Sequence, residues 1–235
     1  MGTLAAGTQA HSAVSLTTEP LTPIWHPSPN FGARRDGLTP SLIVLHYTAM
    51  TSAQAALERL CDPTCEVSAH YLIGSDGTLW QMVSEENRAW HAGAGEWHGQ
   101  ADINSRSIGI ELDNTGFHPF SEPQLTVLEA LLRQMSERWS IRPEHVIGHS
   151  DMAPGRKSDP GPRFPWQRLE HLNLAGQRGQ SAPQSVRMDS FRALAQSAGY
   201  TADANDDTLL AAVRLRYRPW GKGPLEPADF APLAE

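Results

Sequence analysis

The sequence predicts an α/β fold in which a central mixed β-sheet is flanked by helices, with a small helical unit at the C-terminus. Between residues 23 and 175, short apolar runs of strand length alternate with amphipathic runs of helical length. After residue 175 the composition changes to a polar linker, which is followed by two helical patterns and no strand pattern. The 235 residues suit one domain with a small appendage.

Five segments have the features of strands. Three are short apolar runs, which are typical of buried strands in a sheet covered by helices. Two others flank the pair Asp76 and Gly77, which favours the tight turn of a hairpin. The buried strands are expected at residues 41–45, 107–112 and 145–149, and the hairpin strands at residues 70–73 and 78–83.

Two helices are expected within the main domain. Residues 51–61 have small and apolar side chains at helical spacing, and Ser52 is expected to cap the N-terminus. The sequence S-E-P-Q at residues 121–124 matches a capping box and precedes an apolar stripe. That stripe consists of Leu125, Leu128, Leu132, Met135 and Trp139.

The segments between these elements are rich in turn formers. Residues 25–35 are expected to cross the domain surface, and residues 154–165, with four prolines, to form a rigid loop. Residues 86–105 have no clear period and are expected to form one long loop, which in a compact domain is usually functional.

The chain is expected to divide into four parts. Residues 1–22 are small and polar and are expected to form a tail, residues 23–175 the main domain, and residues 176–184 a linker. Residues 185–235 form the C-terminal unit, with its helices at residues 188–198 and 207–216.

Charge and hydropathy exclude several classes of function. Lys and Arg number 19 against 26 Asp and Glu, so the net charge is −7, which disfavours binding to nucleic acid. No apolar run is long enough to cross a bilayer. The first 18 residues lack the basic start and apolar run of a signal peptide, so the cytoplasm is expected, with the periplasm as the alternative. Cys61 and Cys65 could form a local disulfide or remain separate thiols.

Three candidate metal ligands lie where rigid elements meet loops. His46 and His149 end two predicted strands, and Asp159 lies in the proline-rich loop. Two imidazoles and a carboxylate form a known zinc set, which leaves a fourth position for water. Each histidine taken singly is more often structural, as is expected of most other histidines in this chain, among them His70 and His91.

Glu111 and Lys157 are the candidate catalytic residues. Glu111 lies among apolar neighbours in a predicted strand, where an isolated charge is costly. Lys157 precedes Asp159 by two residues, so both side chains point the same way in an extended loop. The alternatives are a core ion pair between Glu111 and an arginine, and a solvated Lys157.

Taken together, five motifs resemble one enzyme family. They are L-H-Y-T-A-M at 45–50, V-S-A-H-Y-L-I at 67–73, W-H-A-G at 90–93, S-I-G-I-E-L at 107–112 and G-H-S-D-M-A-P-G-R-K-S-D-P-G-P at 148–162. The series resembles the zinc-dependent N-acetylmuramoyl-L-alanine amidases, which include phage amidase lysozymes and peptidoglycan recognition proteins. The resemblance covers residues 23–175 and is closest to the bacterial branch of cell-wall recycling and broad-specificity amidases.

The resemblance implies a role for each candidate residue. His46, His149 and Asp159 match the metal ligands, so one Zn²⁺ per chain is implied. Glu111 matches the catalytic glutamate, which acts on water, and Lys157 matches the lysine that offsets charge on the tetrahedral intermediate. The implied partner is a muropeptide or peptidoglycan, and the implied reaction separates muramic acid from L-alanine. In such a site Trp90 and Trp97 would form a wall for the sugar, or simply pack the loop.

Several alternatives remain at this stage. The implied activity is hydrolysis of (1,6-anhydro-)muropeptides during peptidoglycan recycling. One alternative is an amidase that cleaves intact peptidoglycan. The others are a non-catalytic recognition module and a zinc hydrolase that acts on an unrelated amide. The C-terminal unit is similar to a degenerate peptidoglycan-binding module, most of all at residues 217–220, but a packing role fits equally. The sequence does not determine the oligomeric state.

Overall fold

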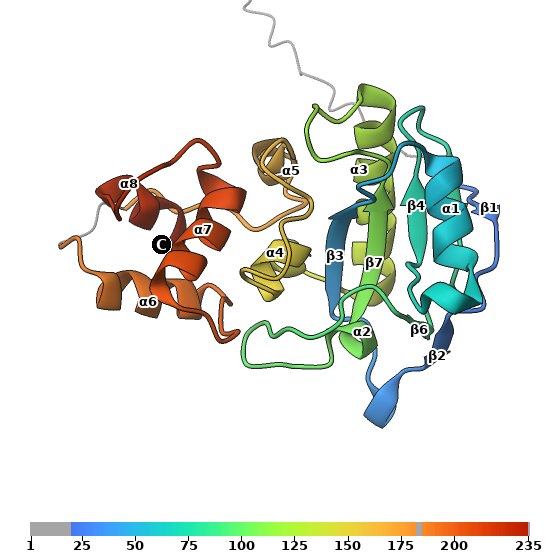
Figure 1. Cartoon of the computed structure of the whole chain (residues 1–235), viewed down its shortest axis with the longest axis horizontal. Helices are drawn as coiled ribbons and strands as arrows, with labels where there is room; N and C mark the ends of the chain where they lie inside the picture. Colours follow the sequence, from blue (N-terminus) through green and yellow to red (C-terminus); the bar gives the residue numbers. More distant parts are fainter. Residues whose placement is uncertain (1–19, 182–184, 235) are drawn as a thin grey trace, which may run out of the picture.

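The computed structural model describes residues 20–181 and 185–234, and its centre is a six-stranded mixed sheet (Figure 1). The strand order is β1-β5-β4-β7-β3-β8. Strands β4, β7, β3 and β8 run parallel to one another, and β5 is antiparallel to β4. The strands are β1 (Ile24–Trp25), β3 (Leu42–Tyr47), β4 (Tyr71–Ile73), β5 (Leu79–Gln81), β7 (Ser107–Leu112) and β8 (Val146–Gly148). The predicted α/β fold class is therefore confirmed.

Helices cover the sheet, and a separate group of helices follows it. The α-helices are α1 (Ala53–Cys61), α2 (Ile103–Arg106), α3 (Glu122–Trp139), α4 (His149–Met152), α5 (Trp166–His171), α6 (Met188–Ser197), α7 (Asp206–Tyr217) and α8 (Pro227–Phe230). Short 3-10 helices are η1 (Arg35–Gly37), η2 (Pro63–Cys65), η3 (Pro143–His145) and η4 (Ala231–Leu233). Both serine caps form as expected, since the side chains of Ser52 and Ser121 accept hydrogen bonds from Ala55 N and Gln124 N. The full capping box does not form, because the Gln124 side chain donates to the carbonyl oxygens of Ile73 and Asp113 instead.

The two faces of the sheet have different neighbours. Ile43, Leu45, Ile108 and Ile110 point to one face and pack against the apolar stripe of α3. Because side chains alternate along a strand, His46 and Glu111 point to the opposite face. In the parallel pairing of β3 with β7, these two residues are register partners.

Several sequence-based expectations need correction. The segment 86–105 is not one long loop, because β6 (Asn87–Ala89) and the start of α2 lie in it. Strand β6 pairs with β2 (Phe31–Ala33), within the stretch expected only to cross the surface. Both strands are three residues long, too short for a period to show. His149 does not end a strand but begins α4, with Gly148 at the N-cap position.

The C-terminal helices pack against the sheet-containing part of the chain. Figure 1 shows them, in orange and red, beside α4 and α5, in yellow. Phe191, Tyr200 and Val213 share one buried apolar cluster with Trp97 and Met152. This cluster joins the two parts across a common core.

Some expectations concern residues that the structure does not describe. The predicted tail, residues 1–22, lies outside the described residues apart from its last three, and residues 182–184 of the predicted linker are also outside them. Within the described ranges, no helix has both the length and the apolar character needed to cross a membrane. Cys61 and Cys65 are both free thiols, so they form no local disulfide.

Candidate metal centre

The candidate site lies at the carboxyl edge of the parallel strands. His46 is near the end of β3, Glu111 is near the end of β7, and His149 follows β8 directly. Because parallel strands end at the same edge, residues far apart in the sequence come together there. The loop after α4 returns to this edge and adds Lys157 and Asp159. The tertiary structure thus brings together all five residues that the sequence singled out.

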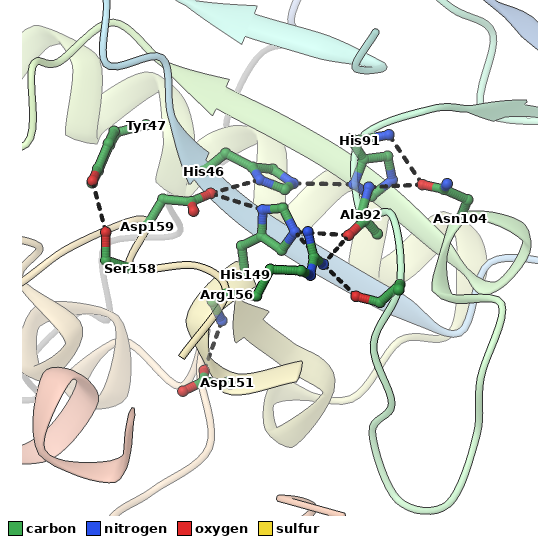
Figure 2. A network of polar contacts seen from close by, with 12 residues as sticks. His46, Tyr47, His91, Ala92, Asn104, His149, Asp151, Arg156, Ser158 and Asp159 are labelled. Carbon is green, nitrogen blue, oxygen red and sulfur yellow. Dashed lines mark hydrogen bonds and ion pairs between the residues drawn. The ribbon is translucent and has the colours of Figure 1, made fainter. Parts of the chain in front are cut away.

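His46, His149 and Asp159 form a compact cluster. One potential ligand atom from each of the three lies within 4.8 Å of the other two, and all three residues are buried. The Oδ2 atom of Asp159 lies 2.8 Å from Nδ1 of His46 and 3.0 Å from Nδ1 of His149. Figure 2 shows both imidazoles pointing at this carboxylate.

The outer contact of His149 fixes which ring nitrogen carries its proton. Nε2 of His149 lies 2.8 Å from the carbonyl oxygen of Ala92, which can only accept a hydrogen bond. The nearby Nη2 atom of Arg156, 3.3 Å from Nε2, donates its two hydrogens to the carbonyl oxygens of Ala92 and Ala94. In the neutral ring Nε2 therefore carries the proton, and Nδ1 presents a lone pair to Asp159.

His46 is fixed in the same way, through His91. Ser107 Oγ donates its hydrogen to the carbonyl oxygen of Ile103, so it accepts from Nε2 of His91 at 3.2 Å. The other nitrogen of a neutral His91, Nδ1, then accepts from Nε2 of His46 at 3.0 Å. Nδ1 of His46 is left with a lone pair, which also faces Asp159.

This arrangement fits a cation. Burial lowers the pKa of His46 to about 4, and the neighbouring His149 lowers it as well, whereas the contact with Asp159 raises it. Burial would raise the pKa of Asp159, but its contacts with His149 and His46 outweigh that effect and lower it. Two imidazole nitrogens and a carboxylate oxygen therefore converge on one point, and a cation bound there would replace any proton that the imidazoles share with the carboxylate. Two imidazoles and one carboxylate are a ligand set that zinc accepts.

Glu111 lies beside this cluster with an unused carboxyl oxygen. Its Oε2 is buried and has no hydrogen-bond partner among the described residues. Burial raises its pKa to about 8, and the negative charge of Asp159 adds to this rise. No arginine pairs with Glu111 in the described part of the chain, so the alternative of a core ion pair is not supported. A buried carboxyl group with a raised pKa is suited to proton transfer near neutral pH.

A cavity of about 410 Å³ joins the cluster to Glu111 and Lys157. Its wall also contains Arg59, Arg156 and Trp90. Lys157 and Asp159, which were expected to point the same way, both line this cavity. Trp97, by contrast, does not line this cavity, because its ring packs against Tyr200 in the shared core, with ring centroids 5.0 Å apart.

Sequence reasoning gave His91 no role beyond a structural one. The structure places it next to His46 and shows how the chain makes room for it, since a Cβ at Gly109 would lie 2.4 Å from Cγ of His91. The side chain of Asn104 holds the backbone at residues 91 and 92, because its Oδ1 atom accepts hydrogen bonds from the N–H groups of His91 and Ala92. The sequence signal for this role was the motif W-H-A-G, which contains His91 and Ala92, the residues that contact His46 and His149. His70, by comparison, is a structural histidine, because it bonds to Gly109 N and to the Asn87 carbonyl.

Comparison with known proteins agrees with this geometry. The N-acetylmuramoyl-L-alanine amidase family model matches residues 36–162. Over 149 residues, covering 57% of this chain and 53% of the relative, the chain is 41% identical to the N-acetylmuramoyl-L-alanine amidase AmiD of Escherichia coli. Over 163 residues, covering 62% of this chain and 89% of the relative, it is 35% identical to the E. coli 1,6-anhydro-N-acetylmuramyl-L-alanine amidase AmpD. The match thus spans about half the length of AmiD and most of AmpD.

Solved structures of the same family share the fold. E. coli AmiD, in complex with the substrate anhydro-N-acetylmuramic acid-L-Ala-D-γ-Glu-L-Lys, superposes with a TM-score of 0.74 and 30% identity, over 83% of this chain and 86% of that one. AmpDh3 of Pseudomonas aeruginosa gives a TM-score of 0.73 and 27% identity, over 95% and 96%. The family model covers more than half of the sequence, and the sheet edge carries the ligand cluster and the buried glutamate. This chain belongs to the N-acetylmuramoyl-L-alanine amidase family.

Proposed function

We propose that this protein hydrolyses the amide bond between the muramic acid lactyl group and L-alanine in muropeptides. The observation that carries the proposal is the buried, unpartnered Oε2 atom of Glu111, which lines one cavity with the His46, His149 and Asp159 cluster. A general base next to a metal-binding set is the arrangement that amide hydrolysis needs.

We propose one zinc ion per chain, held by His46, His149 and Asp159. When bound there, zinc acts as a Lewis acid toward water and toward a carbonyl oxygen. The outer contacts of the imidazoles, through His91 and the Ala92 carbonyl, keep both Nδ1 atoms directed at the ion.

The residues of this chain carry the proton transfers. Glu111 takes a proton from the attacking water as the new C–O bond forms. It returns that proton to the alanine nitrogen as the C–N bond breaks, so the amine leaves neutral. Lys157, on the cavity wall, offsets the negative charge that develops on the carbonyl oxygen.

The cavity wall supports a muropeptide as the substrate. Trp90 offers a flat apolar face to a sugar ring, and Arg59 and Arg156 offer positive charge to the carboxylates of a stem peptide. The alternative of a non-catalytic recognition module is disfavoured, because such a module has no need of a buried unpartnered carboxyl group beside a ligand cluster.

Among muropeptides we favour the 1,6-anhydro forms. The relatives named AmpD are 1,6-anhydro-N-acetylmuramyl-L-alanine amidases, and AmiD was solved with an anhydro-muramic substrate. Such fragments arise from wall turnover, so the reaction would belong to peptidoglycan recycling. Imported fragments would place the enzyme in the cytoplasm. Cleavage of intact peptidoglycan in the periplasm is the alternative, and fractionation of the native cells distinguishes the two compartments.

Mass spectrometry of the reaction products tests the proposal. The zinc-loaded protein is incubated with soluble anhydro-muropeptides and, separately, with intact sacculi, with Glu111→Gln as the matched control. We expect free stem peptide and anhydro-sugar from the first substrate, and little from the control. Preferential release from sacculi would support the alternative substrate. No release from either substrate would contradict the amidase activity.

A further inference from the structure

Helix α7 of the C-terminal unit packs against the segment that carries three of the five site residues. That segment, residues 149–159, begins with α4 and contains His149, Lys157 and Asp159. Halfway along it, Gly155 lies against Thr208 of α7, so that an added Cβ would lie 2.7 Å from the Thr208 methyl group. Helix α7 of the C-terminal unit thus packs closely against residues 149–159.

A buried polar network also joins the two parts. Asp151 of α4 is fully buried, and both its carboxylate oxygens are used. Tyr200 donates its hydroxyl hydrogen to Oδ1 at 2.7 Å, and Arg216 donates to Oδ2 at 2.7 Å. Tyr200 and Arg216 are themselves 2% and 5% exposed, so water does not weaken these bonds.

The same carboxylate is tied to the start of α4. Oδ2 of Asp151 also accepts from the backbone N–H of Gly148 at 2.7 Å. Gly148 and Asp151 lie on either side of His149, so this bond fixes the turn from which the imidazole projects. Arg216 further contacts the strand before that turn, since it donates to the carbonyl oxygen of Val146 at 3.3 Å.

Arg216 is itself held rigidly. Its guanidinium group lies over the ring of Trp166, 4.0 Å from the centroid. A contact chain therefore runs from the C-terminal unit, through Arg216 and Tyr200, to Asp151 and then to the turn that carries His149.

We propose that the C-terminal unit is a positioning element of the metal centre, in which Arg216 and Tyr200 act on His149 through Asp151. The inference rests on the metal site of the proposed function. Outer partners that orient metal ligands are commonly worth tenfold or more in metal affinity. A unit that only covered an apolar surface would contribute to stability and leave zinc affinity unchanged.

The test uses the full chain and three substitutions. Tyr200→Phe removes one hydroxyl group and keeps the ring, and Arg216→Met removes the charge and keeps much of the volume. Arg214→Met is the matched control, because Arg214 forms a similarly buried ion pair, with Asp229 of the same unit, and makes no hydrogen bond to the catalytic part in the described structure. Thermal unfolding of each metal-free variant establishes the conditions in which all of them are folded.

The readout is the zinc dissociation constant, measured by competition with a chromophoric chelator. We expect Arg216→Met to raise it by ~10-fold, and Tyr200→Phe to raise it in the same direction, while Arg214→Met leaves it within about twofold despite lower stability. Equal zinc affinity in Tyr200→Phe and the parent would overturn the proposal, even if Arg216→Met did not fold. If the three variants changed zinc affinity as expected but the parent protein cleaved no muropeptide, the proposed function alone would be contradicted.

Discussion

Glu111 is the direct register partner of His46 in the parallel pairing of β7 with β3. Both side chains point to the sheet face opposite α3, so a candidate general base lies next to a candidate metal ligand. The spacing between neighbouring strands, about 4.8 Å, sets their separation without help from a flexible loop. Because the sheet fixes this distance, His46 can serve as a metal ligand while Glu111 lies beside it as the general base.

The metal content of the protein tests the ligand set. We expect about one zinc per chain, and we expect His149→Ala to lose most of it, because the other two ligands alone bind weakly. Zinc is measured after dialysis by atomic absorption. His171→Ala, which changes an exposed histidine outside the cluster, is the control. Full metal content in His149→Ala would remove His149 from the ligand set.

The catalytic pair is tested by variants that retain the metal. Glu111→Gln should bind zinc normally, because Glu111 is not one of the three ligands, yet lose kcat by ~10²-fold or more as the proton acceptor is removed. Lys157→Ala should lose ~10²- to 10³-fold, the size of effect seen for oxyanion donors. Steady-state kinetics and zinc analysis are run on the same samples. A metal-free Glu111→Gln protein would show that its assigned role is wrong.

His91 should matter for zinc affinity although it is not a ligand. His91→Phe keeps a ring against Gly109 but removes the nitrogen that accepts from His46. We expect zinc binding to weaken by ~10- to 100-fold, the range found for outer partners of metal-bound histidines. Chelator competition measures the change. An unaltered zinc dissociation constant would mean that His91 only fills space.

The buried His70 should make the metal-free protein less stable in acid. Burial of the ring in the core lowers the pKa of His70 from 6.5 to about 3 and outweighs the hydrogen bond to the Asn87 carbonyl, which raises it; the charge of Arg34 lowers it as well. Because the pKa of His70 is lower in the folded than in the unfolded state, its contribution to the free energy of unfolding is complete above pH ~6.5 and is lost as the pH falls toward 3. At pH ~5 the loss is about 2 kcal/mol.

Urea unfolding at several pH values checks this linkage. His70→Gln has no proton to take up in this range, so its stability should fall less steeply between pH ~7 and ~5. The readout is the slope with pH, which does not depend on any overall destabilisation. Equal slopes for the variant and the parent would contradict the linkage.

The extent of the catalytic unit can be tested by truncation. All five candidate site residues precede residue 176, which predicts that catalysis needs only residues 23–175. The structure adds a condition, because removal of the C-terminal unit would expose Asp151, Trp97 and Met152 to water. We expect a chain that ends at Gln180 to aggregate or to bind zinc weakly, as measured by size-exclusion chromatography and chelator competition. A monodisperse truncated protein with the zinc affinity of the full chain would contradict this.

The sequence by itself indicated the candidate residues of the site and most of the regular elements. His46 follows one predicted strand, Glu111 lies within another and His149 ends a third. Ser52 and Ser121 mark two helix starts that the structure retains. These features are local, because periodicity and capping depend on residues only a few positions apart. The order of motifs along the chain was enough to indicate the family.

Only the tertiary structure decided how distant segments meet. The pairing of β2 with β6, the contact of His91 with His46 and the bonds from Arg216 and Tyr200 to Asp151 all join residues far apart in the sequence. Such contacts depend on how the sheet closes and which surfaces it leaves to be covered, and no short window of sequence encodes that. A buried histidine or arginine has the same local signature whether it only packs or also orients a metal ligand.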